Sequence, residues 1–196
     1  MTSWLHEERL EAVLEALRSA GARSVLDLGC GDGDLIVRLA AEPWVERLAG
    51  IDLSEPALAR LRARLAAAAA EAEIMPGSML DPPASLKGFD AAALVETIEH
   101  LDPSDLGRLE RALFLRLRPG TIVITTPNAE FNALLGVRPG AMRRPDHRFE
   151  WGRARFRAWA EGAAGRAGYA VSFSDVGGRH PTLGAASQMA LFRRAA

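Results

Sequence analysis

The sequence contains almost no cysteine and no long apolar run, and each scarcity narrows what the protein can be. Cys30 is the only cysteine among 196 residues, which excludes an intramolecular disulfide and a cysteine-rich zinc site. No apolar run approaches the roughly 18 residues that span a bilayer, and the charged N-terminus lacks the apolar core of a signal peptide. We therefore expect a cytoplasmic protein that does not enter membranes.

An excess of charge of either sign is also missing, because 24 basic and 25 acidic residues leave a formal net charge of −1. The overall charge gives no sign of nucleic-acid binding, so any anion-binding surface has to be local. Lys87 is the only lysine, and the other basic side chains are arginine. Two explanations stay open: a compositional bias that also accounts for the abundant alanine, or a use of arginine for bidentate phosphate contacts.

Strand-like and helix-like segments alternate along the chain. Helical spacing and capping signals predict helices over residues 3–20, 32–42, 54–72, 103–117 and 152–167. Apolar runs predict strands at 23–29, 46–53, 72–76, 89–95, 121–127, 169–175 and 187–193. Residues 128–150, rich in proline, glycine and arginine, are expected to be irregular with one helical turn.

This alternation predicts a parallel, doubly wound α/β sheet with helices on both faces. The last two predicted strands are joined by a connection too short for a crossover helix, so they should pair antiparallel at one edge. With 48% hydrophobic residues, residues 1–196 suffice for a single domain with a substantial core.

A glycine-rich turn, "VLDLGCGDGDL", joins the first of these strands to a helix. Gly29, Gly31 and Gly33 let the backbone turn tightly and approach a ligand. Asp27 lies at the end of this strand, and Asp52 ends the next strand, where an acidic residue can bind ribose hydroxyls. The alternative to a ligand site is that the glycines only form a turn and that Asp27 and Asp52 cap helices. The G-x-G-x-x-G spacing of nicotinamide-dependent dehydrogenases is missing.

These residues resemble the class I S-adenosylmethionine-dependent methyltransferases. The resemblance implies a Rossmann-like fold with a mostly parallel seven-stranded sheet and an antiparallel edge strand. It also implies that Asp27 and the three glycines hold the methionine part of S-adenosylmethionine and that Asp52 holds its ribose. In "GSMLDP", Ser78 and Met79 take the position of the adenine contacts.

The stretch "ALVETIEHL" places two carboxylates and an imidazole after the apolar fourth strand. Glu96, Glu99 and His100 have i, i+3, i+4 spacing and would project to one side of a helical turn. Two carboxylates that close repel each other, and a divalent cation relieves the repulsion. His147 is the best candidate for a fourth ligand, because the segment after the fifth strand faces the same crevice. A purely structural loop histidine is the alternative.

"ETIEHL" followed by "DHRFEW" resembles the HUA-ENHANCER-type methyltransferases, which modify the 2′-oxygen of the 3′-terminal ribose of RNA. The segment "TTPNAEFN" is similar as well. The resemblance implies a catalytic centre in which Glu96, Glu99, His100 and His147 bind Mg²⁺ or Mn²⁺ and an RNA end with free 2′- and 3′-hydroxyls. It also implies a kinase–phosphatase or ligase partner in RNA repair, reached in bacterial relatives through an N-terminal half that these residues do not contain.

A dense arginine set surrounds the proposed fourth ligand. Residues 138–157 contain seven arginines and two acidic residues, a local charge of +5. Arg143, Arg144 and Arg148 are the predicted RNA contacts, and Phe149 and Trp151 are predicted to stack on a base. The alternative, that the aromatic residues of this region pack in the core, is favoured for Phe156 and Trp159.

The predicted activity is therefore metal-dependent methyl transfer from S-adenosylmethionine to the 2′-hydroxyl at an RNA 3′ end. One alternative is a metal-independent methyltransferase for a small molecule, with the acidic cluster as general base. Another is a non-catalytic protein that binds RNA ends without binding S-adenosylmethionine.

Overall fold

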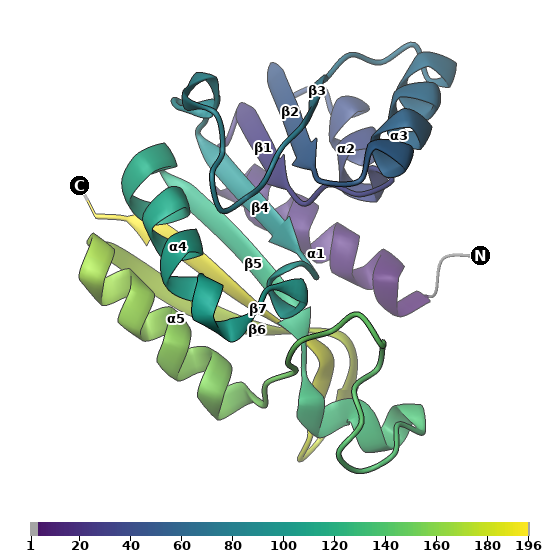
Figure 1. The fold of residues 1–196 in the computed structure, drawn as a ribbon, viewed down its shortest axis with the longest axis vertical. Coiled ribbons are helices and arrows are strands. Elements are labelled where there is room, and N and C mark those ends of the chain that lie inside the picture. The colour runs from purple at the N-terminus through teal and green to yellow at the C-terminus, as the bar shows by residue number, and fades with distance from the viewer. Residues whose placement is uncertain (1–3, 196) are drawn as a thin grey trace.

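The computed structural model describes residues 4–195, whose strands form one twisted seven-stranded sheet (Figure 1). The strands are β1 (Ser24–Leu28), β2 (Arg47–Asp52), β3 (Glu73–Pro76), β4 (Ala91–Val95), β5 (Thr121–Pro127), β6 (Tyr169–His180) and β7 (Gly184–Arg194). They lie in the order β3-β2-β1-β4-β5-β7-β6. β1 to β5 pair in parallel, and β7 is antiparallel to both β5 and β6. The mixed α/β sheet predicted from the sequence is confirmed.

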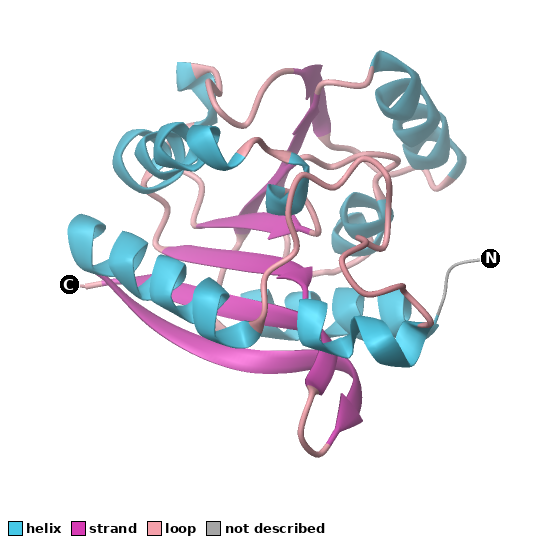
Figure 2. Cartoon of the chain, turned by 60° about the horizontal axis from the view of Figure 1, so that its bottom comes forward, coloured by secondary structure: helices cyan, strands magenta, loops and turns pink. Residues whose placement is uncertain are grey.

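Helices cover both faces of the sheet. One face carries α1 (Trp4–Ser19), α2 (Asp34–Ala40) and α3 (Glu55–Ala67), and the other carries α4 (Leu106–Glu110) and α5 (Arg153–Ala167). Figure 2 shows the sheet between these helices, with the tip of the β6–β7 hairpin extending beyond them. Within residues 4–195, we find no helix with the length and apolar content needed to span a bilayer.

The central strands are apolar on both faces because both faces are covered. In β1, Val25 belongs to the core beneath α1–α3, whereas Leu26 and Leu28 belong to the core beneath α4 and α5. In β4, Ala93 and Ala92 divide between the two cores in the same way. Successive side chains of a strand point to opposite faces, so an unbroken apolar run is what a doubly covered strand requires.

Two of the predicted helices differ from the structure. The N-cap of α3 is as predicted, since Ser54 Oγ accepts a hydrogen bond from Ala57 N at 3.4 Å. However, α3 ends at Ala67 instead of continuing to residue 72, because Ala69 has a left-handed φ of 50° and Ala70 N bonds back to Leu65 O. The helix predicted over 103–117 is continuous but changes pitch: a 3₁₀ turn at Pro103–Asp105 and α4 lead into π-helical turns at Arg111–Leu117.

The final hairpin is longer than predicted. Gly177 and Gly178, which we had placed in the connection, lie inside β6 at a register shift and have φ values of 75° and 63°. A Cβ on Gly177 would lie 3.1 Å from the carbonyl oxygen of Leu5, and one on Gly178 would lie 3.0 Å from Trp4. These glycines therefore let the start of α1 pack closely on β6, which brings α1 to the carboxyl ends of the strands.

Candidate active site

The glycines of the turn between β1 and α2 serve two different purposes: close packing and space for a ligand. Gly29, Gly31 and Gly33 all have positive φ. A Cβ on Gly33 would lie 2.1 Å from Leu61 of α3, so this glycine is needed for packing. Nothing lies within 4 Å of the equivalent position on Gly31, which lines an open cavity. The turn therefore leaves room for a ligand at Gly31.

The two predicted acids flank this turn. Asp52 Oδ2 accepts a hydrogen bond from Gly31 N at 2.9 Å, and its Oδ1 accepts one from Ser54 N at 2.8 Å. Asp27 is only 2% exposed and lines the cavity. Burial, and then the nearby Asp52 charge, raise the pKa of Asp27 to about 7. A buried carboxylate beside a second acid is suited to a cationic ligand.

Of the two predicted adenine contacts, Ser78 and Met79, the second lies close to the glycine-rich turn. Met79 approaches Gly29, where a Cβ would lie 3.0 Å from its Cε. Ser78 Oγ accepts a hydrogen bond from Leu80 N at 3.2 Å. Both side chains are partly buried. They are not among the residues that line the cavity.

One cavity of about 600 Å³ joins the two predicted sites. Asp27, Gly29 and Gly31 line it on the side of the cofactor turn. Its lining from the other predicted site consists of Glu96, Glu99, His100 and His147. A ligand at the turn and a second one at these side chains would therefore share one cavity at the carboxyl ends of the strands.

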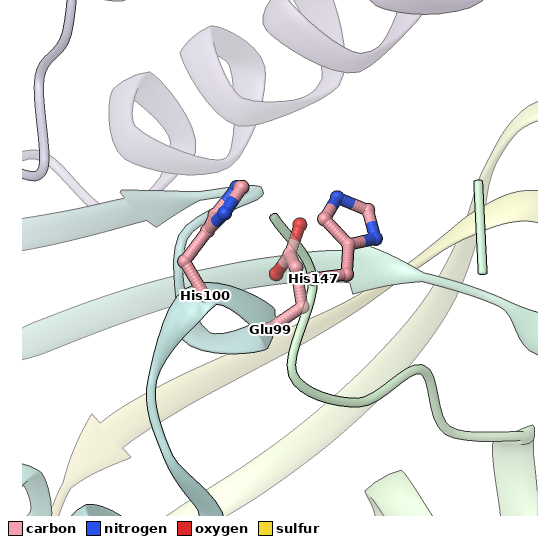
Figure 3. A group of neighbouring side chains, drawn as sticks. All are labelled: Glu99, His100 and His147. Atoms are coloured by element: carbon pink, nitrogen blue, oxygen red, sulfur yellow. The ribbon is translucent and has the colours of Figure 1, made fainter. Parts of the chain in front are cut away.

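Glu99, His100 and His147 form a compact cluster (Figure 3). One ligand atom from each side chain lies within 4.8 Å of the other two. The two imidazole rings meet edge to face with centroids 4.9 Å apart. Glu99 and His100 come from a 3₁₀ turn directly after β4, and His147 comes from the loop before α5. The loop is tied to the turn because Arg148 N donates to Glu99 O at 2.7 Å.

One carboxylate oxygen of the cluster is buried without a hydrogen-bond partner among residues 4–195. Glu99 is fully buried, and Thr126 Oγ1 donates to its Oε2 at 3.0 Å, but its Oε1 has no hydrogen-bond partner. Burial and the charge of Glu96 raise the pKa of Glu99 well above its usual value. Burial and the neighbouring His147 lower the pKa of His100, which favours the neutral imidazole that binds metals.

Glu150 holds His147 in place. Its Oε1 lies 2.5 Å from His147 Nδ1 and accepts a hydrogen bond from Arg143 N at 2.7 Å, while its Oε2 accepts one from Asn132 Nδ2 at 2.6 Å. This residue was missed in the sequence analysis, although it stands three positions after His147 in the same motif.

Glu96 lies in the cavity but outside this cluster. It has a left-handed φ of 53°, and its Oε1 lies 3.2 Å from Arg9 Nε. Ser187 Oγ donates to its Oε2 at 3.2 Å. Three of the four predicted ligands are therefore assembled, while the fourth is paired with an arginine from α1. Nothing in the sequence pattern pointed to Arg9 or Ser187.

The predicted RNA contacts differ in their accessibility. Arg144 and Arg148 are exposed, and Arg144 lines the cavity. Arg143 lines the cavity but is engaged, because its Nε donates to Asn132 Oδ1 and its Nη2 donates to Asn128 O, both at 2.6 Å. Its half-buried side chain therefore holds the loop together.

The expectation that Phe149 and Trp151 stack on a base does not fit the structure. Phe149 is 8% exposed and stacks on Trp151, with ring centroids 4.3 Å apart. Phe156 is fully buried, and Trp159 packs against the same core. The core alternative thus holds for these aromatic residues, which pack on one another.

Comparisons with known proteins agree with this geometry. Residues 25–120 match a family described as a methyltransferase domain. The small RNA 2′-O-methyltransferase of Gallus gallus is 36% identical over 185 residues, which cover 88% of this chain and 48% of that protein. The chain spans about half the length of this curated relative.

Two solved structures show the same fold. The methyltransferase domain of bacterial CtHen1 is 35% identical, with a TM-score of 0.88, and the match covers 98% of this chain and all of that one. A chain in the structure of the Pnkp1/Rnl/Hen1 RNA repair complex is 20% identical, with a TM-score of 0.71, over 99% of this chain and 42% of that one.

Proposed function

Since the chain belongs to the Hen1 family of small RNA 2′-O-methyltransferases, we propose that it transfers a methyl group from S-adenosylmethionine to the 2′-hydroxyl of an RNA 3′-terminal ribose. The observation that carries the proposal is the single cavity shared by the glycine-rich turn and the Glu99–His100–His147 cluster. Methyl donor and acceptor have to lie next to each other for in-line transfer, and a shared cavity allows this.

The residues at the turn fit S-adenosylmethionine. Bound there, this group would supply an electrophilic methyl on a sulfonium. The open space beside Gly31 admits a ligand backbone, and Asp27 provides a buried negative charge for a cationic ligand. Asp52, at the end of β2, is the proposed partner of the ribose hydroxyls. Ser78 and Met79 remain the proposed adenine contacts.

The cluster fits a divalent cation. Glu99, His100 and His147 would hold it, with Glu96 as the proposed fourth ligand, and the cation would lower the pKa of the ribose hydroxyl. The buried, unpaired Oε1 of Glu99 supports this assignment. Glu150 engages Nδ1 of His147, which leaves Nε2 for a metal and fixes the ring orientation. Two imidazoles favour softer ions, so we expect Mn²⁺ to support activity better than Mg²⁺.

The chain's own residues prepare the reaction in three ways. Asp27 and the turn hold one reactant, and the buried cluster orients the hydroxyl of the other. Arg144 and Arg148 are exposed and are proposed to contact RNA phosphates.

We also propose a partner and a location for the protein. The structure of the Pnkp1/Rnl/Hen1 complex is that of an RNA repair complex, and we infer a similar repair partner for this protein. The single cysteine suits a reducing cytoplasm. Copurification of the kinase–phosphatase or ligase with the tagged full protein would test the partner.

Methyl transfer to matched RNAs tests the activity. RNAs that end in a 2′,3′-diol, a 2′-methoxy group or a 3′-phosphate should be offered to purified protein with labelled S-adenosylmethionine and Mn²⁺, with and without EDTA. We expect label only on the diol RNA and only without EDTA. Undiminished transfer in EDTA would exclude the metal, and labelling of a small molecule instead of RNA would support the alternative activity.

A further inference from the structure

Arg9 of α1 forms an ion pair with the carboxylate of Glu96. Arg9 Nε lies 3.2 Å from Glu96 Oε1, and the two side chains are only 11% and 18% exposed. Water and salt therefore screen this pair much less than they screen the ion pairs on the surface. The positive charge of an arginine beside a proposed metal ligand opposes the binding of a metal cation there. The arginine therefore requires an explanation.

The pair is held at both ends. Arg9 Nε and Nη2 donate to Ser187 Oγ at 3.2 and 3.0 Å, and Ser187 Oγ donates to Glu96 Oε2 at 3.2 Å. Arg9 Nη1 also lies 3.1 Å from His6 Nδ1. The backbone of Glu96 is fixed separately, because Glu96 N donates to Thr125 O at 3.1 Å. Only the side chain of Glu96 would have to move to reach the cluster.

Arg9 also contributes to the charge balance of the cavity. Glu96 and Glu99 repel each other, and the positive charges of Arg9 and Arg143 offset this repulsion in the structure. The ligand atoms of Glu99, His100 and His147 gather within 4.8 Å of one another without Glu96. A divalent cation at the cluster would perform the same task and would need Glu96 for itself.

We propose that Arg9 is a built-in competitor of the divalent cation: it holds Glu96 apart from Glu99, His100 and His147, and the cation displaces it when Glu96 becomes the fourth ligand. Arg9 is thus a positioning residue that weakens metal binding. The inference rests on the metal site of the proposed function. It makes a counterintuitive prediction, since removing a buried ion-pair partner should strengthen binding.

The test is direct Mn²⁺ binding, measured by the electron paramagnetic resonance signal of free Mn²⁺ without S-adenosylmethionine or RNA. Arg9→Met should lower the Kd for Mn²⁺ by about 10- to 100-fold, the range over which groups that hold metal ligands alter affinity. Arg9→Lys, which keeps the charge, should stay near the wild-type value. Arg18→Met is the matched control, because Arg18 lies on the same helix, is exposed and pairs with Glu42.

A double-mutant cycle shows whether Glu96 carries the gain. In a Glu96→Gln background, Arg9→Met should change the Kd by less than threefold, because the released side chain is no longer a carboxylate. If Arg9→Met unfolds the protein, Ser187→Ala provides a milder test: it removes the hydroxyl that holds both side chains and should also tighten Mn²⁺ binding, by a smaller factor.

The outcomes separate this inference from the proposed function. Unchanged or weaker Mn²⁺ binding by folded Arg9→Met would overturn the inference while leaving the metal site intact. A gain that persists in the Glu96→Gln background would also overturn it. If neither the wild type nor any variant binds Mn²⁺, the metal site itself is wrong. A gain that depends on Glu96 supports the inference even if no RNA is methylated.

Discussion

Glu150→Gln is the perturbation that most directly tests how the His147 side chain is held. The Glu150 carboxylate is 3% exposed and faces three donors: His147 Nδ1, Arg143 N and Asn132 Nδ2, at 2.5, 2.7 and 2.6 Å. A glutamine keeps the shape but has only one acceptor oxygen. In either orientation its amide NH₂ would meet at least one of these donors, so His147 loses a fixed tautomer or the loop loses an anchor.

The structure sets the size of two effects. A buried donor left without an acceptor costs about 1–3 kcal/mol of stability, and each kcal/mol lowers the Tm by roughly 2–4 °C in a chain of this length. Loss of a carboxylate that orients a ligating histidine weakens metal affinity by about 10- to 100-fold, which is about 1.4–2.8 kcal/mol. The second effect should be visible as a loss of activity that excess Mn²⁺ restores.

The assay is titration of methyl transfer and of Mn²⁺ binding against Mn²⁺ concentration. Glu130→Gln is the matched control, because Glu130 belongs to the same connecting region but pairs with Arg153 at 2.7 Å, away from the cluster. We expect Glu130→Gln to lower stability without changing the Kd for Mn²⁺. The reasoning would be refuted if Glu150→Gln bound Mn²⁺ as tightly as the wild type, or if both variants lost affinity equally.

Three further predictions concern the cofactor acid, the RNA surface and the core. Because the pKa of Asp27 is raised to about 7, the folded protein keeps a proton that the unfolded chain releases near pH 4. Stability should therefore fall by roughly 4 kcal/mol at most as the pH rises from about 4 to above 7. Asp27→Asn should flatten this dependence in thermal melts and weaken S-adenosylmethionine binding at pH 8. Arg144→Ala with Arg148→Ala should weaken RNA binding and reduce the salt slope by about one per lost phosphate contact, whereas Arg23→Ala, before β1, should leave both unchanged. Phe114→Ala should lower the free energy of unfolding, measured in urea, by about 3–5 kcal/mol, because Phe114 is buried against Tyr169 and Phe192. The control Leu115→Ala changes an exposed neighbour and should lower it by less than about 0.5 kcal/mol.

Local signals were enough to predict the sheet and most of the cluster. The turn around Gly31 follows from glycines between a strand and a helix, and Glu99 and His100 are adjacent in one short turn after β4. The end of α3 and the length of β6 were not predictable in the same way. Alanine favours helix at every position, so the left-handed Ala69 has no sequence signal. In the sequence, Gly177 and Gly178 are typical of a loop. Their place inside β6 is explained only by the close packing of α1 against them.

Phe149 and Arg143 show why residue type alone misleads. An aromatic ring and a guanidinium beside a catalytic loop suit RNA equally well in a sequence, but the fold uses Phe149 to cover Trp151 and Arg143 to bind Asn128 and Asn132. These roles depend on partners that are close in space and on the depth at which the loop lies. The spacing of residues along the sequence reveals neither the spatial partners nor the depth of the loop.

The sequence by itself determined the fold class, the glycine turn, the acids at the ends of β1 and β2, and the identity of the residues around the cluster, because each depends on neighbours within a few positions. Only the tertiary structure decided that His147 reaches Glu99 and His100, since this requires the loop before α5 to bond to the turn after β4. It also decided that Glu96 pairs with Arg9. Long-range packing of α1 on β6 creates that pair, and no local pattern records it.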